Sequence, residues 1–298
     1  MLIDKGTQLF ANQGHTDWIT ISVLLSRLAS DIVADHASIS ITQYRILIRL
    51  FMNPDGINVT AIADKLSLSL ATITNALNNL EKHKAIQRSY DTSDKRIVYV
   101  RITENGRDLI EEIDPAIKEL AHEFWSEYTA EELTLTFKDS QSTAMRHNLA
   151  YITNETMSVE NAYIDSAWVI GVELGRQMKR ANISLNEYRL LYLLSEQPEG
   201  MRPSDASRRL LLRSNEITVA SSKLEHHGRL RREHSNSDRR SSTLFITDEG
   251  KRKLERITPQ IVDAFRNNIC KTNEQSFEHY DNIAHKILRK NQKRHLLL

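Results

Sequence analysis

The sequence is poor in cysteine, glycine and proline, and each shortage excludes a class of protein. Its one cysteine, Cys270, cannot form an internal disulfide, which fits the reducing cytoplasm. With nine glycines and five prolines in 298 residues, long stretches of Leu, Ile, Glu, Lys and Arg favour helices. No apolar run reaches the roughly 18 residues of a membrane span, and residues 1–14 do not resemble a secretory signal. We therefore expect a soluble, cytoplasmic, mainly helical protein that has no membrane partner.

The short motifs of common enzymes and metal sites are also missing. The sequence contains no glycine-rich phosphate loop, no nucleophile elbow and no HExxH zinc motif. Its eleven histidines form no compact cluster with ligand spacing, and the adjacent His226 and His227 do not share a helical face. We expect no catalysis, no cofactor and no metal site.

Charge is nearly balanced in total but not along the chain. Residues 60–101 hold seven Lys or Arg against four Asp or Glu, and residues 204–245 hold nine against five. Residues 105–160 hold only four against twelve. This pattern indicates two basic surfaces on an acidic body and favours a polyanionic partner, although solvated helix faces of different sign are an equally simple reading.

The two basic segments belong to an internal repeat. Moving the sequence by 144 residues aligns 41–106, the first copy, with 185–250, the second copy, without a gap. The phrase SDKRIVYVRITENG at 93–106 returns as SDRRSSTLFITDEG at 237–250. Two copies at this period indicate two related domains rather than a solenoid, and we place them at 1–152 and 153–298.

Hydrophobic period and turn signals give each copy the same order of elements. We expect helices at 16–36, 41–53 and 70–84 with counterparts at 157–181, 185–197 and 214–227. Thr60 and Ser204 are expected to cap a short helix that precedes the 70–84 and 214–227 helices. Residues 86–91 and 97–102 read as a hairpin around a polar turn, a long helix follows Thr103 and Thr247, and final helices are expected at 131–152 and 272–293. The fold class is therefore mainly α with small β-hairpin wings: two tandem winged helix-turn-helix domains.

The helix at 70–84 separates an inward from an outward face. Ile73, Ala76, Leu77 and Leu80 recur at helical spacing and should be buried. The outward side then carries short, mostly polar side chains, which suit close approach to base edges in a DNA major groove. A merely solvated helix without a partner is the alternative.

The hairpin tip adds positive charge beside that helix. Arg96 is expected to project with Lys95 beside it, and Asp94 is expected to hold the Arg96 guanidinium through a charge-assisted hydrogen bond. An arginine on a thin hairpin suits the negative potential of a minor groove. A plain turn with a surface ion pair is the alternative.

The combined pattern resembles the MarR family of transcriptional regulators. The residues that carry the resemblance are a Leu-Glu pair near the end of the 70–84 helix, an Arg, Asp-x-Arg and Ile-Thr-x-x-Gly, all present in both copies. Members of the family are typically one such domain, act as homodimers and grip a near-palindromic double-stranded operator. The resemblance implies a single-chain pseudo-dimer joined through a helical, dimerisation-like body. It leaves open whether the pseudo-dimer associates again.

The resemblance also assigns roles to residues. The residues expected at the recognition helices are Ser69, Ala71, Thr72, Thr74, Asn75, Asn78, Arg213, Ser214, Asn215, Thr218 and Ser222. The wing residues expected to contact DNA are Asp94, Lys95, Arg96, Asp238, Arg239 and Arg240. Many relatives bind a small aromatic or anionic effector, for which Trp18, Tyr44, Trp168 and Tyr188 are candidates, although aromatics at helical spacing are more often core.

The two copies differ at the positions that would read bases. Ser69, Thr72 and Asn75 become Arg213, Glu216 and Val219, so we expect unequal half-sites, with Arg213 suited to guanine. The first copy also has Lys84 where the second has Gly228, so its helix is expected to end differently. Because Glu216 would place a negative charge beside DNA phosphates, it leaves an alternative function open: a protein-interaction module that titrates another regulator without binding DNA.

Overall fold

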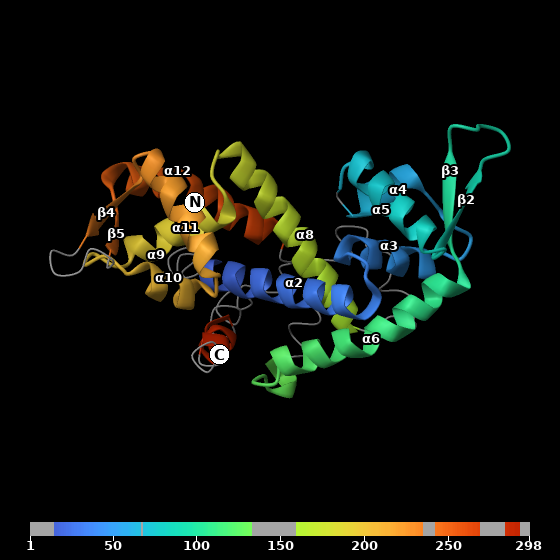
Figure 1. Ribbon diagram of the computed structural model, residues 1–298, viewed down its shortest axis with the longest axis horizontal. Coiled ribbons are helices and arrows are strands. Elements are labelled where there is room, and N and C mark those ends of the chain that lie inside the picture. Colours follow the sequence, from blue (N-terminus) through green and yellow to red (C-terminus); the bar gives the residue numbers. More distant parts are fainter. Residues whose placement is uncertain (1–14, 67, 133–158, 235–241, 269–283, 293–298) are drawn as a thin grey trace. The chain divides into compact units, whose positions relative to one another are not determined.

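The computed structural model describes residues 15–66, 68–132, 159–234, 242–268 and 284–292 (Figure 1). The chain divides into two compact units, residues 25–169 and residues 1–24 together with 170–298. The division falls inside two long helices, α2 (His15–Ala37) and α8 (Val159–Arg180), which agree with the expected helices at 16–36 and 157–181. The expected boundary near residue 152 lies outside the described residues, so the domain limits of 1–152 and 153–298 stay a prediction.

The two copies repeat one architecture of helices and a small antiparallel sheet. The elements of the first copy and its following helix are α3 (Ile41–Phe51), β1 (Ile57–Asn58), α4 (Val59–Leu66), α5 (Leu70–Lys82), β2 (Ile86–Tyr90), β3 (Val98–Ile102) and α6 (Glu104–Phe124). Those of the second are α9 (Leu185–Ser195), α10 (Pro203–Leu210), α11 (Ser214–His226), β4 (Leu230–His234), β5 (Ser242–Ile246) and α12 (Asp248–Asn268). This order confirms the expected fold class, two tandem winged helices in a mainly helical chain.

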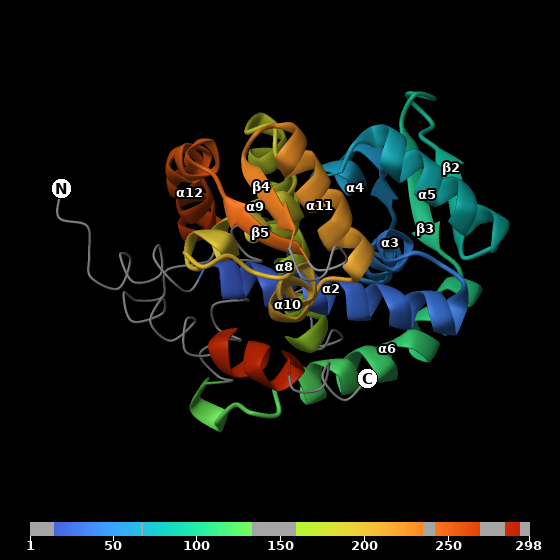
Figure 2. The same cartoon turned by 60° about the vertical axis from the view of Figure 1, so that its left-hand side comes forward.

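The sheets are hairpins that continue directly from the helices. In the first copy β3 pairs with β2 on one side, Ile86 opposite Ile102, and with β1 on the other, Ile57 opposite Val100. In the second copy β4 pairs with β5, and a single bridge joins Met201 to Leu244 where the first copy has the full strand β1. Figure 2 shows β4 and β5 beside α9 and α11.

Polar caps set where most of these helices begin. The hydroxyl of Ser40 accepts from the Gln43 amide, and Ser184 does the same for Glu187 at the start of α9. The short helices begin earlier than expected. Asn58, not Thr60, caps α4 by accepting from the Ala61 amide at 2.7 Å. In the second copy α10 begins at Pro203, so Ser204 lies inside it, because proline needs no amide partner in the first turn.

The repeated Pro-x-Gly turns place a glycine against the wing. Gly56 has φ +94° and Gly200 has φ +72°, the left-handed region that favours glycine. A Cβ at Gly200 would lie 2.8 Å from the Leu244 carbonyl oxygen, and one at Gly56 would lie 3.0 Å from that of Val100. Both turns therefore need glycine twice, for the backbone angle and for the close approach of the wing strand.

Helices α5 and α11 end in the same way, although we expected a difference. Lys84 has φ +55° and Gly228 has φ +65°, so both positions adopt the left-handed conformation that closes the helix. His83 and His227 are the matching C-caps. Lysine thus adopts a glycine conformation because the following strand must start at the same point in both copies.

Candidate nucleic-acid interface

Helix α5 buries one face and exposes the other, as its sequence predicts. Ile73, Ala76, Leu77 and Leu80 are buried. The candidate residues of the first copy on this helix and at its start, Ser69, Ala71, Thr72, Thr74, Asn75 and Asn78, are all exposed. Apart from the alanine, these side chains can exchange hydrogen bonds with a partner, and all are short enough for its surface to come close.

Helices α5 and α11 start with different capping interactions. In α5 the Ser69 hydroxyl accepts from the Thr72 amide at 3.1 Å and bonds to the Thr72 hydroxyl. In α11 the cap reaches backward: the Glu216 carboxylate accepts from the Arg213 amide at 2.9 Å and from the Asn186 side chain at 3.3 Å. Glu216 is therefore committed to the helix start, where the helix dipole favours a negative charge.

Helix α11 presents an exposed face of its own. Ile217, Ala220, Ser221 and Leu224 are buried. The candidate residues of the second copy, Arg213, Ser214, Asn215, Thr218 and Ser222, are all exposed. Arg213 is an exposed residue at the start of this helix.

An arginine on the first strand of each wing braces the recognition helix. Arg88 on β2 donates to the Asn78 side chain at 2.8 Å and lies 3.7 Å from the Glu81 carboxylate. In the second copy Arg232 on β4 donates to the Ser221 hydroxyl at 2.9 Å and lies 3.6 Å from Glu225.

These braces were not part of the sequence prediction. Both the Arg and the Glu are identical in the two copies, at positions 88 and 232 and at 81 and 225, and that identity is the signal that could have revealed them. The Asn78 amide, expected to face bases, is partly engaged by Arg88.

The wing tip of the first copy is organised by two carboxylates. Asp91 accepts hydrogen bonds from the Ser93 amide and hydroxyl and from the Asp94 amide. These bonds hold the pKa of Asp91 below its usual range, and those from Ser93 have the largest effect. Asp94 accepts from the backbone amide of Arg96 at 2.9 Å, not from its guanidinium as expected. The carboxylate thus shapes the turn, and the exposed Lys95 and Arg96 side chains project from it. Asp238, Arg239 and Arg240 of the second wing lie outside the described residues.

The repeated Ile-Thr-x-x-Gly segment joins each wing to the helix that follows. The Thr103 hydroxyl donates to the Lys84 carbonyl at 2.6 Å and accepts from the Gly106 amide, which confirms Thr103 as the cap of α6. Thr247 makes the same two bonds, to Gly228 and Gly250. A Cβ at Gly106 would lie only 2.3 Å from the Ala85 carbonyl oxygen. The segment is therefore structural: it fixes the base of the wing.

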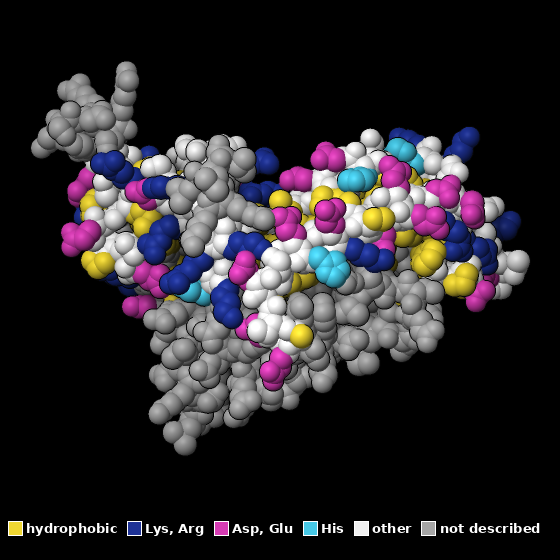
Figure 3. Space-filling view, turned by 90° about the horizontal axis from the view of Figure 1, so that it is seen from below, with side chains coloured by type: hydrophobic (Ala, Val, Ile, Leu, Met, Phe, Trp, Pro, Cys, Tyr) yellow, Lys and Arg dark blue, Asp and Glu magenta, His cyan; other side chains and the backbone are white. Residues whose placement is uncertain are grey.

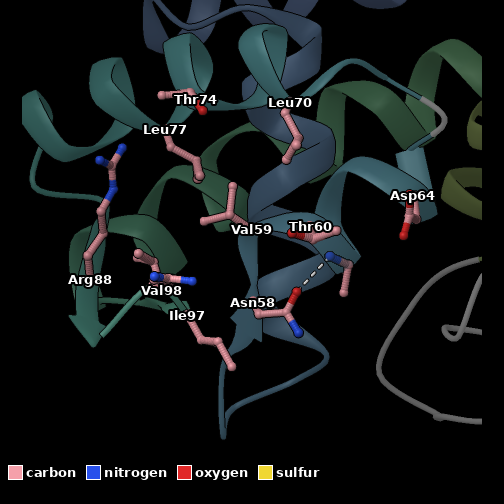
Figure 4. Close-up of a pocket in the computed structure, with 12 residues that line it drawn as sticks. Asn58, Val59, Thr60, Asp64, Leu70, Thr74, Leu77, Arg88, Ile97 and Val98 are labelled. Carbon is pink, nitrogen blue, oxygen red and sulfur yellow. Dashed lines mark hydrogen bonds between the residues drawn. The ribbon is translucent and has the colours of Figure 1, made fainter. Parts of the chain in front are cut away.

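A cleft of about 660 Å³ opens between α5, α4 and the wing of the first copy (Figure 4). Its apolar lining comes from three elements, and Figure 4 shows side chains from each of them facing the same space. Arg88 and Arg96 add positive charge at the wing side and Asp64 adds a carboxylate. The apolar members are Val59, Ala61, Leu70, Leu77, Ile97 and Val98.

The MarR family profile matches this chain twice, at residues 39–98 and at 183–242. The first match runs from α3 to the first residue of β3, and the second runs from α9 to the first residue of β5. The chain is a tandem MarR family protein. The resemblance that the repeated motifs predicted is thereby confirmed.

Individual MarR-like relatives match shorter parts of the chain. It is 43% identical over 54 residues to YwaE of Bacillus subtilis (strain 168), described as an uncharacterized HTH-type transcriptional regulator, which is 18% of this chain and 32% of YwaE. It is 27% identical over 102 residues to YfiV of the same organism, with the same description, which is 34% of this chain and 64% of YfiV. The chain therefore spans 32% of YwaE and 64% of YfiV, less than two thirds of either relative.

Solved structures of the MarR family also match single copies. The chain is similar to Sco3205 of Streptomyces coelicolor, solved in complex with DNA, with 26% identity, a TM-score of 0.41 and coverage of 46% of this chain and 92% of Sco3205. It is similar to the MepR–DNA complex of S. aureus, with 27% identity, a TM-score of 0.36 and coverage of 43% of this chain and 88% of MepR.

The four aromatic residues considered for an effector site of this MarR protein lie mostly in the core. Trp18, Tyr44 and Tyr188 are buried, and Trp168 is half-buried under the Arg45 guanidinium, 5.4 Å from its ring centre. The Tyr188 hydroxyl bonds to Thr258 at 3.2 Å, and burial raises its pKa far above the usual range. Their role in effector binding remains a prediction.

A buried arginine ties α2 to the second MarR domain. Arg189 on α9 is 1% exposed, and its guanidinium donates to the Thr20 hydroxyl at 3.1 and 3.3 Å and to Asn186 at 3.1 Å. It also donates to the Leu210 carbonyl at the end of α10. Because these acceptors belong to three helices, Arg189 fixes the position of α10 against α2 and α9.

The second unit also holds a group of weakly solvated acids. Burial, opposed by a hydrogen bond from His285, raises the pKa of Asp17, and the two side chains lie 3.1 Å apart. Burial and then the nearby Asp17 raise the pKa of Glu196, and burial with both carboxylates raises the pKa of Tyr192 to about 12.

On the face shown in Figure 3 the described residues mix charges of both signs, with apolar side chains in small separate groups. No helix in the described ranges is long and apolar enough to cross a bilayer. Among the same residues no group of three His, Cys, Asp or Glu side chains is arranged to hold a metal ion. Cys270 lies outside the described residues.

Proposed function

We propose that this chain is a sequence-specific transcriptional regulator that binds double-stranded DNA as a single-chain pseudo-dimer. The observation that carries the proposal is the repeated assembly of an exposed, short-chained helix face, an arginine brace and a wing. Equivalent arginine–glutamate pairs, Arg88 with Glu81 and Arg232 with Glu225, hold α5 and α11 although the outer faces of the two helices differ. Frames of this kind place a helix in a major groove and a wing beside a phosphate backbone.

The roles within this interface follow from side-chain chemistry. Lys95 and Arg96, with Arg239 and Arg240 in the second copy, supply affinity at phosphates and the minor groove. The outer faces of α5 and α11 supply sequence preference. The curated relatives are described as HTH-type transcriptional regulators, which supports the same class of function for this chain.

The experiment is a binding titration with a duplex selected by the full-length protein from a random library. Fluorescence anisotropy should give a dissociation constant that weakens steeply with salt, because bound cations displace counterions from phosphates. Arg96→Ala should weaken binding to all duplexes and reduce the salt slope by about one. Failure to select any duplex, with affinity absent at low salt, would refute DNA binding and leave the protein-interaction alternative.

The unequal half-sites belong to this proposal. The Arg213 guanidinium is exposed at the start of α11, whereas the Ser69 hydroxyl at the equivalent place is engaged in capping α5. Arg213→Ala should relax base preference in one half-site by roughly 1–3 kcal/mol. A perfectly symmetric footprint whose halves respond equally to mutation would contradict unequal half-sites. An equal loss of affinity for every sequence would contradict Arg213 as a base reader.

Glu216 was the feature that favoured a protein-interaction module. Its carboxylate is held by the Arg213 amide and the Asn186 side chain, so it is used to start α11. Because this carboxylate already has hydrogen-bond partners within the chain, its presence does not require a basic partner protein. DNA binding remains the function that the site supports best.

The cleft of the first copy supports control by a small effector. It combines an apolar lining with Arg88 and Arg96, which suits a small aromatic anion. In the second copy Leu70, Leu77 and Val98 are replaced by serines, so a ligand would distinguish the two copies. Benzoate at millimolar concentration should lower affinity for the selected duplex, and Leu70→Ser, at a lining position that is 52% exposed, should abolish that effect. If benzoate leaves the affinity of the wild type unchanged, this site does not take such an anion.

A further inference from the structure

We call the row of side chains opposite the buried side of each helix, α5 and α11, its outward ridge. Each outward ridge carries one amide and one aliphatic side chain, one helical turn apart, and their order along the helix is reversed between α5 and α11. At 3.6 residues per turn, Asn215, Val219 and Ser222 lie within about 30° of the direction opposite the buried side of α11. The equivalent ridge of α5 is formed by Ala71, Asn75 and Asn78. Amide and aliphatic groups are thus exchanged between the two helices across one turn, a rise of about 6 Å.

Val219 is difficult to explain by the stability of the folded chain. It is 55% exposed, so burial within the chain recovers little of its hydrophobic free energy. As a β-branched residue in a helix interior it is also less favourable than alanine. Single exposed apolar residues are common, but this one lies on the ridge between Asn215 and Ser222, which are exposed and polar.

In a major groove an amide and an aliphatic side chain can each recognise a particular base. Asparagine can bond to both the N7 and the N6 amino group of adenine, and an aliphatic side chain can pack against the C5 methyl of thymine. Asn215 and Val219 are adjacent on the ridge, so in a major groove they would face neighbouring positions of one half-site. In α5 the first position is the small Ala71 and the second is Asn75.

We propose that α11 reads a thymine methyl group with Val219 beside an adenine read by Asn215, and that α5 presents these two groups in reverse order. This inference rests on the proposed DNA binding and deepens it. It assigns a base to each of these positions. It also predicts that the adenine is read from the first ridge position in α11 and from the second, one helical turn later, in α5. Arg213 adds its own contact at the start of α11.

The test replaces thymine by deoxyuridine, which deletes only the methyl group, at each thymine of a duplex selected by the full-length protein. One substitution in the α11 half-site should weaken wild-type binding about fourfold, the value of one buried methyl group. Val219→Ala should weaken binding to the thymine duplex about fivefold and respond to that deoxyuridine by less than about 1.5-fold. Because Val219 is exposed, this variant keeps the fold.

Two further variants separate base reading from general affinity. Lys223, exposed on α11 but about 70° away from the ridge, serves as the control: Lys223→Ala should weaken thymine and deoxyuridine duplexes by the same factor. The double variant Asn215→Ala/Val219→Asn carries the order of α5, so its selected second half-site should take the order of the first.

The outcomes distinguish the two levels of the proposal. If wild-type protein selects and binds a duplex but no deoxyuridine changes affinity by more than about 1.5-fold, the thymine reading is overturned while DNA binding stands. The thymine reading is also overturned if Val219→Ala keeps the fourfold methyl effect. If no duplex is selected at all, the proposed function itself fails and the reading of bases fails with it.

Discussion

Replacing Thr20 by valine should destabilise the second unit more than replacing it by serine. Valine keeps the shape of threonine but removes the hydroxyl, which donates to the Thr16 carbonyl at 2.7 Å and accepts twice from Arg189. Thr20 is 2% exposed and Arg189 is 1% exposed, so water cannot replace the lost bonds. The charged guanidinium would then be left with fewer acceptors in a buried place.

The magnitude follows from these contacts. A hydrogen bond to a charged group contributes about 1.5–3 kcal/mol, and the 3.3 Å contact is at the long end of the useful range, so Thr20→Val should cost about 3 kcal/mol. Thr20→Ser loses one buried methyl group and should cost about 1 kcal/mol. At a slope of about 2 kcal/mol per molar urea, the unfolding midpoints should fall by about 1.5 M and 0.5 M.

The assay combines urea unfolding with hydrogen exchange, because a chain of two units need not unfold in one step. Exchange in peptides of α9 and α10 should accelerate in Thr20→Val, since Arg189 also holds the Leu210 carbonyl at the end of α10. If valine were no more destabilising than serine, the bonds between Thr20 and Arg189 would contribute nothing net to stability.

Three other changes test separate parts of the frame. Gly106→Ala forces a Cβ to within 2.3 Å of the Ala85 carbonyl and should lower the free energy of unfolding by about 3 kcal/mol in urea titration, whereas alanine at Gly171, which has open space, should not. Lys84→Gly should raise the stability of the first unit by about 1 kcal/mol, because Lys84 occupies the left-handed region, and an unchanged midpoint would contradict this strain. Glu196→Gln should stabilise the second unit at pH 7 but not below about pH 4.5, because a raised carboxyl pKa makes ionisation costly only above the unfolded value of 4.5. Urea midpoints measured at pH 4 and pH 7 check the sign, and a gain that grows toward acid would refute it.

Much of the winged-helix fold could be predicted from the sequence because its helices and wing depend on local patterns. The helical spacing of Ile73, Ala76, Leu77 and Leu80 identified the buried face of α5, and the polar turn at 92–96 identified its wing. Both are sequence-local signals whose meaning does not depend on distant residues. The end of α5 at Lys84 was misjudged because the requirement of the following strand overrode the preference of lysine.

Contacts between distant residues could not be predicted in the same way. Thr20 and Arg189 are 169 positions apart, and no local pattern indicates that one accepts from the other. Asp94 was expected to bond the Arg96 guanidinium, but the turn places the amide of Arg96 nearer to the carboxylate, and the shorter path costs less side-chain entropy. The repeat could have revealed the braces, through the identity of Arg88 with Arg232 and of Glu81 with Glu225.

The comparison of the two copies separates residues that hold the frame from residues that distinguish its two surfaces. Several positions that face the core or form the brace are the same in α5 and α11: Ile73 and Ile217, Leu80 and Leu224, Glu81 and Glu225. Positions on the outward ridge differ, as Ala71 and Asn215 or Asn75 and Val219 show. A homodimer of identical chains must present one ridge twice, so any change in it alters both half-sites together. A fused chain is free of that restriction. If the ridges contact bases, substitutions in one ridge should alter one half-site alone, while loss of either brace should weaken the whole contact of its copy without changing base preference.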